Sequence, residues 1–509
     1  MTSVTLKWCR SRSTNRSAHL FLFMLLLPAF ISVVLMSLFP DFMPTWFGAY
    51  ADQRFFQLGL LLVTTLAALL WMPEAYSGLK LLYANWAVLL VSASFLVLVI
   101  PNSSGEYAWV EPGMYSLYFV AFAVLGWRIC EQDLSRSAAV MLVHVVTIAC
   151  FFYAAMTITV YLFAIADGFS TLTDIIPWGF VNMRYWNHMA TWLLPILPLT
   201  LMYSPFSKNK LWQMGIGFTA GIWWWMIFMT TARGSMLSLA LACAVICVLY
   251  GRAVLPWLMI SLRFIVFGGL AWLLLSLVIP SIVFEELTVR GLRAGSSGRM
   301  QLWFEAWYMS LQHFPVGMGP QSWITHEIIT GDLPANSRLG HPHNMYLMWA
   351  AEYGWLLVTT IVVLLATTLR NLGIKARQVR AGAHEYPEVL IAFTASAVAG
   401  LVHASFSAVF IVPASMLVGV LVLSIFWALS LQEPHRSEAI SKRGRRSGYP
   451  SAIQIALTCA IAVGGVVWFK QVWGYHQAMV ADLQKYEEGS NGAYWPRFWF
   501  HGNFPRPES

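Results

Sequence analysis

Long runs without a charged residue constrain this chain more than any other feature of its sequence. Phe21–Phe39 and Leu82–Ile100 contain no Lys, Arg, Asp or Glu, and each run is long enough to cross a bilayer as a helix. Of the 509 residues, 58% are hydrophobic and only 11% are charged, whereas a soluble domain has about 25% charged residues. The sequence therefore excludes a water-soluble globular protein and predicts a polytopic membrane protein.

The hydropathy pattern predicts an all-α fold, a transmembrane helical bundle of about 12–13 spans. The spans are joined by short turns, except for one large extracytoplasmic loop in which we expect short interfacial helices. The candidate spans lie near 19–39, 55–72, 81–100, 113–130, 138–165, 188–204, 211–231, 235–251, 264–284, 344–369, 387–409, 413–431 and 452–469.

The distribution of basic residues predicts the orientation. The N-terminal arm carries Lys7, Arg10, Arg12 and Arg16, and Lys and Arg favour the cytoplasmic side. Every second turn after it is also basic, so we expect a cytoplasmic N-terminus and an extracytoplasmic C-terminal segment. The net charge of +8 then reflects topology, and no nucleic-acid partner is expected. Residues 1–39 show no convincing small-x-small cleavage site, which favours a retained anchor over a cleaved signal peptide.

These boundaries divide the chain into four parts. Residues 1–284 form the first nine spans, and residues 285–343 form the outer loop. Residues 344–469 form spans ten to thirteen, and residues 470–509 form a short aromatic outer tail.

Arginines on the predicted outer side point to function, because positive charge is disfavoured there. Ion pairs with nearby Asp and Glu are the alternative explanation, but exposed pairs contribute little. The arginines in these outer segments are Arg184, Arg233, Arg290, Arg293, Arg299 and Arg338.

Two of these arginines lie in local patterns that suit an anion. Arg233 lies between two apolar runs with hardly room for a loop, so its guanidinium is expected at headgroup depth, where it needs water or an anion; snorkelling to lipid phosphate is the alternative. Arg299 follows Gly295–Gly298 and precedes an apolar pattern with helical spacing, which predicts an interfacial helix ending before His313. A serine N-cap on that helix, with Arg299 in its first turn, would make a phosphate cradle. A simple capped surface helix is equally compatible with the pattern.

A histidine pair precedes the tenth span. His343 is expected at the outer rim, where an imidazole can accept a proton from a hydroxyl. His341 and His343 could together bind a metal, but no further ligand follows at a familiar spacing, so we expect neither metal nor cofactor. Glu352 lies about two and a half turns beyond His343 and points to the opposite helix face, which favours pairing inside the bundle.

Together these residues predict an outward-facing pocket with several arginines and a neutral histidine. Paired arginines suit a diphosphate, and an adjacent base suits deprotonation of an attacking hydroxyl. Phosphoryl or glycosyl transfer from a lipid diphosphate is the indicated reaction class.

The same residues resemble motifs of the O-antigen ligase superfamily, in the same order. Tyr185–Ala190 resembles its NRNHFA-like segment, with Trp186 where a basic residue is usual, and Thr231–Ser235 is similar to its (S/T)RG(A/S) element. Residues 299–319 resemble its R-x-x-x-W and P-x-G-x-G loop, and His343-Asn344 with Gly354 matches HN-x9-G. The resemblance covers roughly residues 180–370.

The resemblance implies an inverting, metal-independent glycosyltransferase of the bacterial inner membrane. It implies an undecaprenyl-diphosphate-linked glycan as donor and an acceptor hydroxyl on the periplasmic side. By motif, His343 is the general base and Arg233 and Arg299 bind the diphosphate together with Arg184. The supporting residues are His188, His341 and Asn344.

Three functions stay open at this point. The first is an O-antigen ligase acting on a glycolipid, and the second is a polymerase or protein O-oligosaccharyltransferase of the same superfamily. The third, from another class, is a flippase or exporter of a lipid-linked glycan, which would be expected to show internal repeats and charges through the bilayer centre. No repeat is evident between the halves of the chain.

Overall fold

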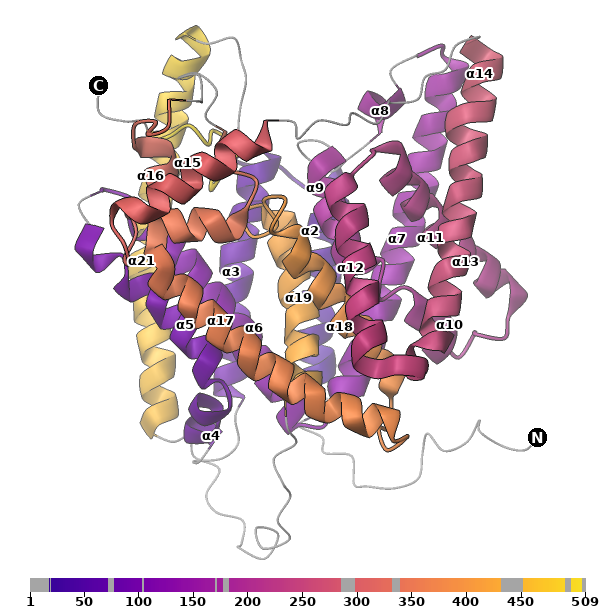
Figure 1. Ribbon diagram of the computed structural model, residues 1–509, viewed down its shortest axis with the longest axis horizontal. Helices are drawn as coiled ribbons and strands as arrows, with labels where there is room; N and C mark the ends of the chain where they lie inside the picture. Colours follow the sequence, from indigo (N-terminus) through magenta and orange to yellow (C-terminus); the bar gives the residue numbers. More distant parts are fainter. Residues whose placement is uncertain are drawn as a thin grey trace, which may run out of the picture.

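The computed structural model describes residues 18, 20–71, 77–102, 105–169, 172–176, 183–284, 298–331, 339–431, 452–489 and 496–505. Within these ranges the chain folds into helices and contains no strand, so the predicted all-α membrane bundle is confirmed (Figure 1). The predictions for the N-terminal arm and for Arg290, Arg293 and Arg338 lie outside the described residues, as does the turn expected between the spans 413–431 and 452–469.

The first part of the bundle extends to the end of α14. Its helices are η2 (Phe21–Leu26), α2 (Leu27–Leu38), η3 (Pro40–Phe42), α3 (Ala49–Leu70), α4 (Ser77–Ala84), α5 (Trp86–Val97), η4 (Ile100–Asn102), α6 (Val110–Glu131), α7 (Ser135–Ala166), α8 (Leu172–Ile175), α9 (Met183–Leu193), α10 (Pro198–Tyr203), α11 (Lys210–Met229), α12 (Arg233–Tyr250), η5 (Gly251–Val254), α13 (Leu255–Trp272), η6 (Leu273–Val278) and α14 (Ile279–Phe284). The second part contains α15 (Arg299–Gln312), α16 (Ser322–Thr325), α17 (Met345–Arg380), α18 (Pro387–His403), α19 (Pro413–Ser430) and α21 (Ala452–Gly489).

Eight continuous helical stretches in the described residues are long and apolar enough to cross a membrane. They are Phe21–Leu38, Ala49–Leu70, Val110–Glu131, Ser135–Ala166, Arg233–Phe284, Met345–Arg380, Pro413–Ser430 and Gln454–Tyr486.

The stretch Arg233–Phe284 covers two predicted spans, 235–251 and 264–284, and the uninterrupted helix α11 corresponds to the predicted span 211–231. The remaining predicted spans correspond to shorter or interrupted helices. A four-residue turn, 194–197, separates α9 from α10; Pro195 lies within it and Pro198 begins α10, because proline cannot supply the backbone donor that a continuous helix needs. Residues 81–100 are likewise divided between α4 and α5 at Asn85. At the other end of the chain α21 continues beyond the predicted limit at 469, to Gly489.

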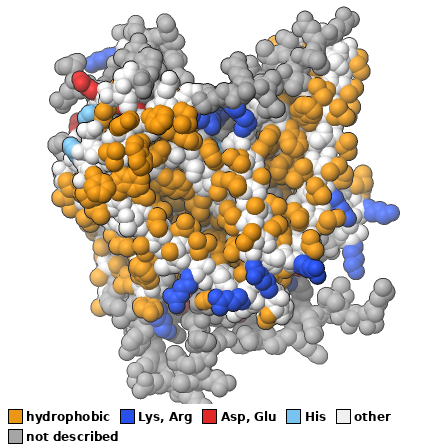
Figure 2. Space-filling model, in the orientation of Figure 1, with side chains coloured by type: hydrophobic (Ala, Val, Ile, Leu, Met, Phe, Trp, Pro, Cys, Tyr) orange, Lys and Arg blue, Asp and Glu red, His pale blue; other side chains and the backbone are white. Residues whose placement is uncertain are grey.

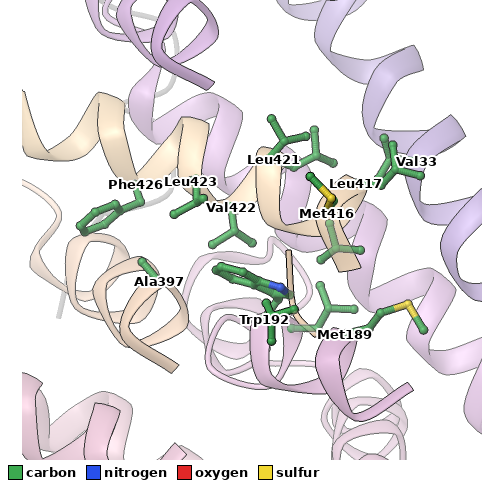
Figure 3. Packing of buried hydrophobic residues seen from close by; sticks show 14 of the residues in the cluster. Val33, Met189, Trp192, Ala397, Met416, Leu417, Leu421, Val422, Leu423 and Phe426 are labelled. Carbon is green, nitrogen blue, oxygen red and sulfur yellow. The ribbon is translucent and has the colours of Figure 1, made fainter. Parts of the chain in front are cut away.

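Helix α19 forms the centre of the bundle, and every one of its residues is buried. An apolar helix without a polar face is stable only when it is surrounded by other elements. Trp192 of α9 packs between α18 and α19 (Figure 3), and a Cβ atom at Gly400 or Gly419 would lie 2.3 or 3.1 Å from its ring. This close packing fixes α9 against the core.

Helix α17 is bent at Gly354, which has φ 78° and ψ 175°. The loop that follows α15 enters this bend: Met318 N–H donates to Ala351 O at 2.8 Å, and Gly319 N–H donates to Glu352 O at 2.9 Å. The loop and the bend therefore form one structural unit beside the amino end of α17.

Basic side chains gather at two levels of the molecule (Figure 2). A small group lies in the upper part of the view, over the region where α9, α12 and α15 meet, and a row follows the lower edge below an apolar belt (Figures 1 and 2). This separation fits the predicted topology, in which the outer arginines lie across the membrane from the basic turns.

Candidate functional site

Four helices direct their amino ends to one region of the protein. Arg233 is the first residue of α12 and Arg299 the first of α15, while Arg184 is the second residue of α9. His343 precedes α17 by two residues. The amino end of a helix carries a partial positive charge and unsatisfied N–H groups, so these positions favour an anion.

The charged side chains at these ends are close enough to act on one another. The positive charges of Arg299 and Arg184 act on His343, and Arg299 is itself influenced by Arg184 and Arg233. The amino ends of α9, α12 and α15, which are distant in the sequence, thus lie near the segment that precedes α17. The structure therefore brings Arg184 and Arg299 near His343, and Arg233 near Arg299.

The turn before α12 explains the position of Arg233. Helix α11 ends at Met229 and α12 begins at Arg233, so the connection is as short as the sequence predicts. Thr231 has a φ of 49°, which is uncommon for a residue other than glycine. Such strained backbone clusters at functional sites.

Arg299 is only partly as predicted. Helix α15 begins at Arg299 and ends at Gln312, before His313, as expected. The N-cap, however, is Gly298 with a φ of 74° and no side-chain cap, so the serine cap of the predicted phosphate cradle is wrong. Glycine takes this position because its left-handed conformation excludes most side chains. The exposed apolar face of α15 includes Phe304, at 51% exposure, and Trp307, at 43%, and suits a helix in the membrane interface.

His343 lies in a fixed and unusual geometry. Its φ is 56°, its backbone N–H donates to Nδ1 of His341 at 3.1 Å, and the two rings meet edge to face at 4.5 Å. Its own Nδ1 atom is buried and has no hydrogen-bond partner among the described residues. Asn344 caps α17 by accepting from the N–H groups of Tyr346 and Leu347.

The surroundings of His343 keep its imidazole neutral. Burial, followed by the positive charges of Arg299 and Arg184, lowers the pKa of His343 to about 3. Burial and the neighbouring His343 also lower the pKa of His341. A neutral imidazole can accept a proton, which is the property required of a general base.

His188 belongs to a second buried histidine group. Its Nε2 lies 2.6 Å from the hydroxyl of Ser407, and its ring is 5.0 Å from that of His403. His403 lies 3.2 Å from Thr191 Oγ1 and 3.4 Å from Ser235 Oγ. The sequence interpretation omitted His403, although an ionisable residue in an apolar span is itself a signal of function.

Glu352 pairs inside the bundle, as predicted. Its carboxylate accepts from Nη2 of Arg497 at 2.6 and 2.7 Å, and the same guanidinium binds Glu111 at 2.8 and 2.9 Å. Burial alone lowers the pKa of Arg497, but the two carboxylates outweigh it and raise this pKa well above its usual range. The sequence interpretation did not identify Arg497, because nothing local marks a tail arginine as buried.

Among the described residues, no group of three or more His, Cys, Asp or Glu side chains is arranged to hold a metal ion.

Comparison with known proteins identifies one family. Residues 218–362 match a family model described as O-antigen ligase. The match contains Arg233, Arg299, His343 and Gly354, and begins after Arg184 and His188. No curated protein and no solved structure gives a significant match.

Proposed function

We propose that this protein is a membrane glycosyltransferase of the O-antigen ligase superfamily, whose family model residues 218–362 match, and that it transfers a glycan from an undecaprenyl-diphosphate donor to an acceptor hydroxyl. The observation that carries this proposal is that Arg184 and Arg299, in the first turns of α9 and α15, lie near enough to His343 for their charges to lower its pKa. This arrangement puts guanidinium groups, which can bind a diphosphate, and the His343 imidazole, which can take a proton from a hydroxyl, in one site. We assign this site to the periplasmic side of a bacterial inner membrane.

In the proposed reaction the guanidinium groups hold the leaving group. Arg184, Arg233 and Arg299 bind the diphosphate, since planar donors match phosphate oxygens and their charge stabilises the departing anion. The acceptor oxygen attacks the anomeric carbon as the bond from that carbon to the diphosphate oxygen breaks. His343 takes the hydroxyl proton, and a single displacement inverts the sugar. His188, His341 and Asn344 support the site.

Donor binding also prepares the base. Burial, and after it the charges of Arg299 and Arg184, lower the pKa of His343, so the imidazole is neutral but weakly basic. A bound diphosphate offsets these positive charges, because an opposite charge nearby favours the protonated imidazole. The basicity of His343 therefore rises when the leaving group is in place.

The test is glycan transfer by purified protein in lipid nanodiscs, with an undecaprenyl-diphosphate glycan and candidate acceptors. His343→Ala is expected to lower the rate by about 10²- to 10⁴-fold, the usual contribution of a general base. His326→Ala is the matched control, because His326 is an exposed histidine of the same loop. Equal rates for both variants would remove His343 from the mechanism.

The acceptor decides among the members of the superfamily. A glycolipid, a growing polysaccharide and a protein offered in parallel distinguish a ligase, a polymerase and a protein O-oligosaccharyltransferase. Movement of intact donor across the bilayer without cleavage of the diphosphate bond would instead identify a flippase.

A further inference from the structure

A buried ionic centre joins three parts of the chain beside the proposed site. Arg497 is 1% exposed, Glu111 2% and Glu352 0%. Burying three charges is costly, and a well-packed apolar cluster is often as stable as a buried ion pair. The centre therefore calls for an explanation beyond stability.

The segment that carries Arg497 is held firmly in the bundle. Tyr50 OH donates to Arg497 O at 2.5 Å, and Arg54 Nε donates to Phe498 O at 3.0 Å. Tyr475 OH donates to Phe504 O at 2.8 Å. These bonds tie residues 496–505 to α3 and α21, so the guanidinium projects from a fixed backbone.

The ionic centre reaches the residues just before the histidine pair by two routes. On one route, Nη1 of Arg497 donates to Gly340 O across 3.5 Å. On the other, Glu352 Oε1 accepts from Trp323 N–H at 3.2 Å, and Nε1 of Trp323 donates to Leu339 O at 2.8 Å. Glu352 thus binds both Arg497, which donates to Gly340, and Trp323, which donates to Leu339.

The last link is His341. It follows Gly340 directly and lies near enough to Arg497 for that charge to act on it. Its Nδ1 accepts a hydrogen bond from the backbone N–H of His343. The connection from the ionic centre to His343 is therefore continuous.

We propose that Arg497 is a positioning residue, which holds the loop 339–343 so that His343 faces the arginines. This inference rests on the proposed function of His343. Arginine suits the task because its nitrogens bind separate acceptors at once: Nε and Nη2 take the two carboxylates, and Nη1 takes the Gly340 carbonyl. Lysine keeps the charge but has no planar fork with which to bridge the three groups.

Two substitutions test the two routes, each with a matched control. Arg497→Lys weakens the first route, and Arg128→Lys is its control, because Arg128 is also buried and bound to a carboxylate and a carbonyl, of Glu131 and Trp71. Trp323→Phe removes the donor to Leu339. Its control is Trp225→Phe, since Trp225 is fully buried and donates through the same atom to Ser276.

We expect Arg497→Lys and Trp323→Phe to lower kcat about 10- to 100-fold, because small displacements of a reacting group have effects of this size. The KM for the donor should change less than about threefold, since the arginines that bind it are untouched. Both controls should keep kcat near the wild-type value. Size-exclusion profiles establish that all four variants are folded.

Two outcomes would overturn the inference: a folded Arg497→Lys variant with wild-type kcat, or equal losses in Arg497→Lys and Arg128→Lys. Failure of the proposed function is a different result. In that case the wild-type protein forms no product, or His343→Ala remains as active as the wild type. If His343→Ala is inactive while Arg497→Lys is fully active, only the positioning role is wrong.

Discussion

Replacing Gly354 by alanine probes the bend in α17 directly. A Cβ atom at this position would lie 2.1 Å from Pro315 O, 2.4 Å from Val316 C and 2.6 Å from Gly317 N. All three atoms belong to the backbone, so no side-chain rotation can relieve the contact. The φ and ψ of Gly354, 78° and 175°, also lie in a region that is essentially restricted to glycine.

The expected destabilisation has two sources. Backbone strain costs about 1–3 kcal/mol, and forcing an extra group into a packed region costs a further 1–3 kcal/mol or so. Gly354→Ala should therefore lower the free energy of unfolding by roughly 2–6 kcal/mol. It should also reduce glycan transfer, because Glu352 lies two residues before the bend.

Gly373→Ala in the same helix is the control. Gly373 is helical, and a Cβ there meets no atom within 4 Å, so alanine should be neutral or stabilise the helix by up to about 1 kcal/mol. Unfolding of the purified variants can be followed by tryptophan fluorescence against denaturant. If the midpoint of Gly354→Ala equals that of Gly373→Ala, the explanation of the bend is refuted.

Three further outcomes are expected. Arg299→Lys should reduce transfer more than loss of charge explains, because the planar fork is lost; equal rates with lysine would contradict a bidentate diphosphate contact. Asn344→Ala should lower the free energy of unfolding by about 0.5–2 kcal/mol, since it removes the cap on the N–H groups of Tyr346 and Leu347, whereas Asn344→Ser should restore most of it. Because the pKa of His343 is lowered to about 3 in the donor-free protein, kcat/KM should show no acid limb near pH 6.5. The acid limb of kcat should lie at higher pH than that of kcat/KM, because donor binding raises the pKa of His343. An acid limb of kcat/KM near pH 6.5 would show that the pKa of His343 is not lowered.

Sequence reasoning predicted the membrane bundle because hydropathy is a local signal. Each span carries its own pattern, as in α7, which extends over Ser135–Ala166 where 138–165 was predicted. The prediction fails where a local interruption divides an apolar run, as at Pro195, or where a helix continues past its apolar part, as α21 does. Hydropathy reports burial in lipid and says little about the exact ends of a helix.

The site was predictable only in part, for a related reason. Arg233 and Arg299 are conspicuous because a charge beside an apolar run is costly, and that cost can be read from the sequence. Arg497 is not conspicuous, since its carboxylates lie in α6 and α17, 386 and 145 residues away along the chain. Pairing over such a distance depends on the tertiary fold, which the local pattern does not encode.

The environment of Arg299 combines a local sequence signal with contacts that depend on the tertiary fold. Local consistency is the rule in folded proteins, and conflicts concentrate at functional sites. Burial lowers the pKa of Arg299, and the charges of Arg184 and Arg233 lower it further; no carboxylate among the described residues forms an ion pair with it. A half-buried cation held beside two others is unfavourable without an anion to bind them. A dianionic headgroup would add an attraction to each of the three guanidinium groups and so offset their mutual repulsion, so the proposed diphosphate donor would stabilise an arrangement that is otherwise unfavourable.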